Sequence, residues 1–228
     1  MLNLFSKLKF LLRKPKVIII TGSGRACAAE AIFQVLNSHF KIGKEVLIFE
    51  TELKDTEEFK FFAKHSSLPI LVVTQIGDIP PDKNFFAGDR ERTFKIRELA
   101  KTLPIQGHLI LNFDDETVRE IKDETNLKEL TFGLQDYNSP TTSSRSPLGE
   151  RAPRADFWAS DIKLNSGTNF KINYKGRVVP IWLEEVFGKE QIYSALAAVA
   201  VGTIFDLNLV EISQALQNFQ TSDIMQKV

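Results

Sequence analysis

The chain has 228 residues, 43% of them hydrophobic, and its 29 Lys and Arg residues balance its 29 Asp and Glu residues. A folded chain with zero net charge has no overall field that attracts nucleic acid, and without a run of about 20 apolar residues it predicts no membrane-spanning helix. The single cysteine excludes an internal disulfide and is typical of a reducing compartment, so we expect a cytoplasmic protein.

Residues 1–16 mix Leu and Phe with Lys and Arg. This pattern fits a short basic amphipathic helix in peripheral contact with an anionic membrane surface. It also fits a helix that packs on the domain, or a frayed lead-in, and it lacks the small-residue cleavage site of a signal peptide. We favour the packed helix or lead-in, and peripheral membrane contact is the alternative.

The most informative segment follows directly. Four β-branched residues at 17–20 predict a buried strand, residues 21–24 (Thr-Gly-Ser-Gly) predict a turn, and an Ala-rich helix is expected from about Ala26 to Asn37. A strand, a glycine turn and a helix N-terminus in this order present backbone N–H groups to a phosphate. The segment therefore predicts a first turn that resembles a phosphate-binding loop.

The chemistry of such a loop is altered here. A loop that binds a nucleoside triphosphate also needs a Lys for the phosphates and a Ser or Thr hydroxyl for Mg²⁺. Arg25 and Ala26 occupy these two positions. Cys27 follows in the first helical turn, where a thiol pKa can be lowered, but a lone cysteine is more often a small packing residue, and we favour that interpretation.

The remaining elements alternate between strands and helices. Strands are predicted at 45–50, 68–74, 108–112 and 128–132, and helices at 57–65, 90–103, 117–125, 188–203 and 208–219. Alternation of this kind predicts an α/β fold with a doubly wound, mostly parallel sheet. The Asp114-Asp115 pair after the 108–112 strand is a candidate metal ligand, but we favour a cap for the helix that follows it.

A change in composition marks the middle of the chain. Residues 138–154 hold three prolines among Ser and Thr and predict a flexible loop. The alternating strands after it predict a small antiparallel sheet at about 156–183. We expect a lead-in at 1–16, one domain at 17–220 and a tail at 221–228.

Several segments, in this order, resemble the central ATP-binding domain of the Mur ligases, and the resemblance covers about residues 14–220. The segments are 14–23 (KPKVIIITGS), 111–115 (LNFDD), 131–133 (TFG), 188–198 (GKEQIYSALAA) and the closing helix at 207–216. Within the family, the resemblance is strongest to the branch that adds D-alanyl-D-alanine to UDP-N-acetylmuramoyl-tripeptide.

The resemblance implies ATP-dependent ligation of an acid to an amino acid in peptidoglycan precursor synthesis, with ATP and Mg²⁺ as cofactors. It implies that Glu50 binds the metal ion, and it assigns no catalytic residue. The residues expected at the nucleotide are Thr21, Gly22, Ser23, Gly24, Arg25, Ala26 and Cys27 in the turn and helix start, and Asn112 and Asp115 near the base and ribose.

The same resemblance indicates lost chemistry. The turn is one residue shorter than the family loop, Arg25 is not equivalent to a lysine, and Ala26 offers no oxygen to Mg²⁺. The carbamoylated lysine of the family falls on Ile96, with Lys95 about 100° away around the helix, and the family's helix-opening His falls on Glu190. The N-terminal and C-terminal ligase domains also have no counterpart in this sequence.

We therefore expect a nucleotide-binding domain that is catalytically impaired as a single chain, or that works with a separate chain supplying the missing domains. The alternative is a non-catalytic relative that acts as an interaction module, or a fragment of a decayed ligase. A third possibility is that the shortened turn binds another anion, such as phosphate or a sugar nucleotide.

Overall fold

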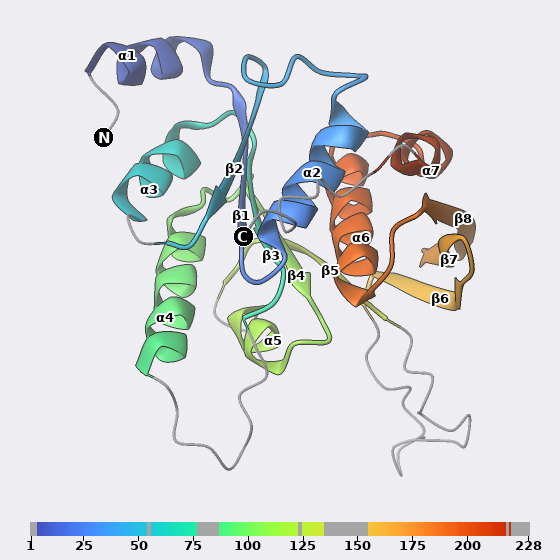
Figure 1. Cartoon of the computed structure of the whole chain (residues 1–228). Coiled ribbons are helices and arrows are strands. Elements are labelled where there is room, and N and C mark those ends of the chain that lie inside the picture. Colours follow the sequence, from blue (N-terminus) through green and yellow to red (C-terminus); the bar gives the residue numbers. More distant parts are fainter. Residues whose placement is uncertain are drawn as a thin grey trace, which may run out of the picture.

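The fold is built on one eight-stranded sheet with helices on both faces (Figure 1). The computed structural model describes residues 4–53, 56–76, 87–122, 125–134, 155–217 and 219. Its elements are α1 (Leu4–Arg13), β1 (Lys16–Thr21), α2 (Arg25–Leu36), β2 (Val46–Thr51), α3 (Thr56–His65), β3 (Pro69–Val73), α4 (Ala87–Thr102), β4 (His108–Asn112), α5 (Glu116–Lys122), β5 (Lys128–Leu134), β6 (Phe157–Leu164), β7 (Gly167–Tyr174), β8 (Arg177–Glu184), α6 (Lys189–Ile204) and α7 (Leu209–Gln217).

The strand order is β2-β1-β3-β4-β5-β6-β7-β8, parallel from β2 to β6 and antiparallel from β6 to β8. The predicted α/β class and mostly parallel, doubly wound sheet are confirmed. The predicted antiparallel strands form as well, and they continue the main sheet because Phe132 of β5 pairs with Phe157 of β6. Strand order reverses between β1 and β3, and ligands of open α/β sheets bind beyond the carboxyl ends of the strands at such a point.

Both faces of the parallel strands are buried. In β1, Ile18 and Ile20 belong to the core beneath α2 and α6, whereas Val17 and Ile19 belong to the core beneath α3 and α4. All four side chains are at most 1% exposed. A strand that is covered on both faces needs apolar residues at every position, which explains the continuous apolar run in the sequence.

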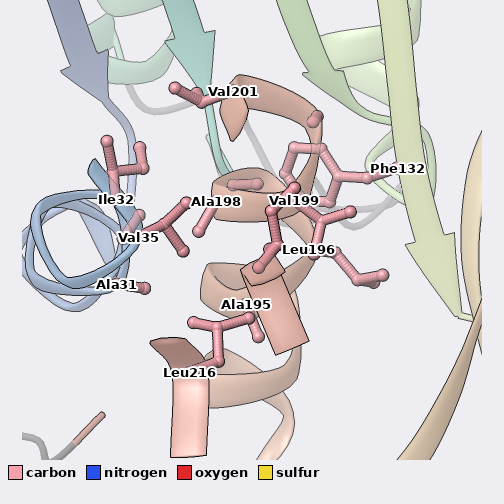
Figure 2. Close-up of a cluster of buried hydrophobic side chains, with 14 of the residues drawn as sticks. Ala31, Ile32, Val35, Phe132, Ala195, Leu196, Ala198, Val199, Val201 and Leu216 are labelled. Carbon is pink, nitrogen blue, oxygen red and sulfur yellow. The ribbon is translucent and has the colours of Figure 1, made fainter. Parts of the chain in front are cut away.

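Small residues bring α2 and α6 close together. Figure 2 shows Val35 of α2 pointing towards Ala198 of α6. Near the end of α6, a Cβ atom on Gly202 would lie 2.7 Å from Ile212 Cδ1 of α7 and 3.1 Å from Val35 Cγ1. The three helices therefore meet at a point where only glycine fits.

Helix α1 packs on the domain through Phe10, which is 7% exposed. The centres of the Phe10 ring and the Phe62 ring of α3 are 4.9 Å apart. This contact is what the packed-helix interpretation expects. No helix in the described ranges combines the length and the apolar character that a membrane span requires. The predicted loop at 138–154 and the tail at 221–228 lie outside the described residues, and the proposed domain boundaries stay a prediction.

Candidate functional site

The turn between β1 and α2 is held tightly against the chain that follows β3. Gly22 has a φ of +105°, and a Cβ atom there would lie 2.5 Å from Thr74 Oγ1 and 2.6 Å from the Gln75 carbonyl oxygen. The Thr74 hydroxyl lies 2.5 Å from the carbonyl oxygen of Ser23, and the Ser23 N–H donates to the Gln75 carbonyl at 2.6 Å. The Ser23 N–H is therefore not available to a phosphate.

Gly24 places the start of α2 at the mouth of this turn. Its φ of +73° is a left-handed conformation that favours glycine, and its carbonyl accepts the Ala28 N–H at 3.0 Å. The first N–H groups of a helix have no partner within that helix. The anion-binding donors that remain are thus those of the first turn of α2.

A pocket of about 360 Å³ opens beside Gly24, at the carboxyl ends of β1, β3 and β4 and the N-terminus of α6. This is the edge of the sheet where the strand order predicts a ligand. The pocket is lined by Ser23, Gly24, Thr74, Gln75, Asn112, Asp114, Asp115, Lys189, Glu190, Tyr193 and Ser194.

Four of the residues expected at the nucleotide come together in this lining: Ser23, Gly24, Asn112 and Asp115. Five others do not line the pocket: Thr21 and Gly22 are buried, Cys27 is buried in the first turn of α2, and Arg25 and Ala26 lie at the start of α2 outside the lining. The metal ligand expected from the resemblance, Glu50, is exposed at the end of β2 and also lies outside the lining. Four of the predicted residues therefore share one pocket, and the roles of all of them stay predictions.

Arg25 is turned towards β2 rather than into the pocket. Its Nη2 lies 2.8 Å from Glu52 Oε1, and its Nη1 donates to the Gly22 carbonyl oxygen at 3.4 Å. The guanidinium therefore neutralises a carboxylate of the same chain, so its charge is partly compensated before any phosphate arrives.

Asp115 and Asn112 shape the floor of the pocket. Asp115, 4% exposed, accepts the Ile76 N–H at 2.7 Å and the Val118 N–H at 3.1 Å, and the second bond caps α5. The helix-cap interpretation is thus confirmed. Asn112 Oδ1 accepts the Asp114 N–H at 3.0 Å, so both side chains use oxygens to hold the loops in place.

Residues from the first turns of α6 complete the site. None of them was predicted to contact the nucleotide, although the resemblance placed Glu190 where the family has a His. Tyr193 donates its hydroxyl to Asp114 Oδ2 at 3.0 Å, and the same oxygen accepts the Leu134 N–H at 2.6 Å. Glu190 lies over the turn: a Cβ atom on Gly24 would be 2.9 Å from Glu190 Cγ and 3.1 Å from its Oε1. Lys189 is the cation of the lining.

The carboxylates around the pocket fit a Mg²⁺ ion poorly, because both Asp115 oxygens accept backbone N–H groups and Asp114 Oδ2 accepts two hydrogen bonds. Among the residues that the structure describes, no three or more His, Cys, Asp and Glu side chains gather in a way that would hold a metal ion. Ile96 is fully buried in the core, and Lys95 on the surface of α4 pairs with Glu91 at 2.5 Å. Neither residue brings a lysine towards the pocket.

Cys27 behaves as a packing residue, as expected. Burial raises the pKa of its thiol to about 11, although a hydrogen bond with Ser194 acts in the opposite direction. At pH 8 the thiolate fraction is then about 0.1%, so we expect reaction with a disulfide reagent to be about a hundredfold slower in the folded than in the unfolded protein. The absorbance of the thiolate released from the reagent, followed at pH 8 with and without denaturant, measures both rates. Equal rates would contradict the burial of the Cys27 thiol.

The doubly wound sheet, with a pocket beside a glycine turn at the carboxyl ends of its strands, defines an α/β domain with a site at its strand ends. A profile of the Mur ligase middle domain family matches residues 28–202. The chain therefore belongs to the Mur ligase middle-domain family, and the family prediction is confirmed. The matched range begins inside α2, after the altered turn.

Relatives of known activity are similar over most of this chain. A UDP-N-acetylmuramate–L-alanine ligase of Hydrogenobaculum sp. is 28% identical over 208 residues, which are 89% of this chain and 40% of the relative. The chain thus spans less than half the length of this curated relative.

Solved structures show the same fold. A UDP-N-acetylmuramoylalanyl-D-glutamyl-2,6-diaminopimelate–D-alanyl-D-alanyl ligase from Acinetobacter baumannii has a TM-score of 0.69 at 18% identity, covering 94% of this chain and 48% of that chain. The MurF ligase from Thermotoga maritima in complex with ADP has a TM-score of 0.66 at 13% identity, covering 91% and 50%. At these identities the likeness shows the fold alone.

Proposed function

We propose that this chain is a nucleotide-binding domain related to the ATP-dependent ligases of peptidoglycan precursor synthesis, and that alone it binds nucleotide weakly and forms no amide bond. The observation that carries the proposal is the pocket in which the glycine turn and the N-terminus of α6 converge. Two helix N-termini attract an anion to the same place. A volume of about 360 Å³ lies within the range of small-molecule sites.

The charges around the pocket argue for weak binding. Asp114, Asp115 and Glu190 line it against a single Lys189, and Arg25 is paired with Glu52. A triphosphate brings several negative charges towards this lining, and like charges at short range repel. The family removes such repulsion with Mg²⁺, for which the described residues provide no fitting donor set.

The acceptor is a separate part of the proposal. The motifs quoted from the sequence favour the branch that adds D-alanyl-D-alanine, whereas the curated relative is an L-alanine ligase. Because the chain covers 40% of that relative, we infer that ligation with either acceptor requires further ligase domains besides this one. The non-catalytic interaction module is the second candidate.

Calorimetric titration of the purified chain with ATP, with and without Mg²⁺, tests the proposal. We expect a Kd in the millimolar range, about −4 kcal/mol, that changes less than about threefold with Mg²⁺ because the Asp114 and Asp115 oxygens are already engaged in hydrogen bonds. Titrations with inorganic phosphate and a sugar nucleotide serve as comparisons. Micromolar, Mg²⁺-dependent ATP binding would contradict the impairment, and no binding of ATP would contradict the nucleotide site itself.

A further inference from the structure

Helix α1 carries a second apolar face that the domain does not cover. Phe10 is 7% exposed against α3, whereas Phe5, Leu8 and Leu12 are 74%, 54% and 79% exposed. At about 100° per residue, these three lie about 140° to 160° around the helix from Phe10. The helix therefore presents a stripe of large apolar side chains on the side opposite its packing contact.

The charged residues of α1 and of the adjoining sequence at 1–16 are all basic. Residues 1–16 contain Lys7, Lys9, Arg13, Lys14 and Lys16 and no acidic residue, so the rest of a chain with zero net charge is net negative. By helical spacing, Lys9 borders the apolar stripe, whereas the Lys7 ammonium nitrogen lies 5.4 Å from the centre of the Phe61 ring in α3. An apolar stripe on a basic helix is the arrangement of helices that lie in the membrane interface.

The position of α1 leaves the pocket accessible. Helix α1 precedes the first residue of β1, whereas the glycine turn follows the last. Figure 1 shows α1 at the end of the molecule opposite the turn between β1 and α2. A surface bound through α1 would thus leave the mouth of the pocket facing away from it.

We infer that α1 is an interfacial helix that binds the anionic surface of a phospholipid membrane through Phe5, Leu8 and Leu12 and the basic residues of the helix. Charge complementarity selects this occupant over a second copy of the chain. Two copies meeting at this face would bring two exclusively basic helices together, and like charges at an interface oppose association. The inference does not depend on what the pocket binds.

Co-sedimentation with phospholipid vesicles tests the inference on the full chain. We expect binding to vesicles containing phosphatidylglycerol at least about tenfold stronger than to phosphatidylcholine alone, and weaker binding at higher salt. The double variant Leu8→Glu/Leu12→Glu should lose about tenfold or more. Because both side chains are exposed, the urea midpoint should stay that of the parent.

The matched control is Ile105→Glu/Val210→Glu, which adds the same charges at apolar positions that are 82% and 56% exposed outside α1. We expect its vesicle binding to stay within about twofold of the parent. Absence of binding, equal binding to neutral vesicles, or equal losses in the two double variants would overturn the inference. So would a dimer, detected by light scattering, that Leu8→Glu/Leu12→Glu dissociates, because the stripe would then cover a second copy.

Discussion

Replacing Glu190 with glutamine is expected to strengthen ATP binding about tenfold, which corresponds to about 1.4 kcal/mol. Glu190 Oε1 lies where it would be 3.1 Å from a Cβ atom on Gly24, so its carboxylate stands at the N-terminus of α2. A carboxylate there is favoured by the helix dipole, and it competes with a phosphate for the same N–H groups. Glutamine keeps the size of the side chain and removes the charge.

The matched control for this variant is Glu184→Gln, at the exposed end of β8 and outside the pocket, which we expect to leave the ATP affinity unchanged. Lys189→Gln should act in the opposite direction and weaken binding severalfold, since Lys189 is the cation of the lining. Calorimetry at one fixed salt concentration compares all four proteins. If Glu190→Gln bound ATP no better than the parent, Glu190 would not be the competing group.

Gly22→Ala is expected to destabilise the fold by about 3 kcal/mol. A left-handed backbone costs a residue with a Cβ atom about 1–2 kcal/mol, and crowding in a filled space adds about 1–3 kcal/mol. At Gly22 the φ is +105°, and the new Cβ would lie 2.6 Å from the Gln75 carbonyl oxygen and 2.8 Å from its nitrogen. These are backbone atoms, which do not yield as a flexible side chain would.

Gly43→Ala separates the two costs. Gly43 also has a positive φ, +82°, but apart from its chain neighbours no heavy atom of the described residues lies within 4 Å of the Cβ position, so we expect a loss of about 1 kcal/mol. Urea unfolding with an unchanged m-value gives both differences. Equal urea midpoints for the two variants would show that the turn at Gly22 moves away from the chain after β3 without loss of stability.

Local patterns predicted most of the elements. The strand at 108–112 was predicted with the bounds that the structure has, because a short apolar run between Gly107 and Phe113 is specific enough. The run at 17–20 was predicted as a buried strand since both faces of the sheet demand apolar residues. The joining of the antiparallel strands to the main sheet was not predicted, because pairing of Phe132 with Phe157 spans a segment without local signal.

Only the part of the pocket formed by the strand ends was predicted from the sequence. Ser23, Gly24, Asn112 and Asp115 follow strands directly, and strand ends that share an edge of a parallel sheet are close in space. Lys189 and Glu190 are brought to the same pocket by α6, which is more than 160 residues away from Gly24 in the sequence. The spacing of residues along the sequence does not show that the start of α6 lies next to Gly24.

The ion pair between Arg25 and Glu52 was not predicted either. The sequence placed the charge of Arg25 in the phosphate position, but the guanidinium lies 2.8 Å from Glu52, one residue beyond β2. The direction of an Arg side chain at the start of a helix depends on which carboxylates lie near it in the folded chain. Glu52 lies near Arg25 because β1 pairs with β2.

The close packing of α2 and α6 has a mechanical consequence. Helix α2 begins at the glycine turn and α6 begins at Lys189, so the pocket lies between the N-termini of these two helices. The helices are held in contact at Val35, Ala198 and Gly202. Tightly packed interiors resist compression and transmit displacement. The width of the pocket is therefore set by the whole helix pair, and a ligand that needs a wider mouth gains room by rotating Glu190 or breaking the Tyr193–Asp114 bond, not by parting the helices.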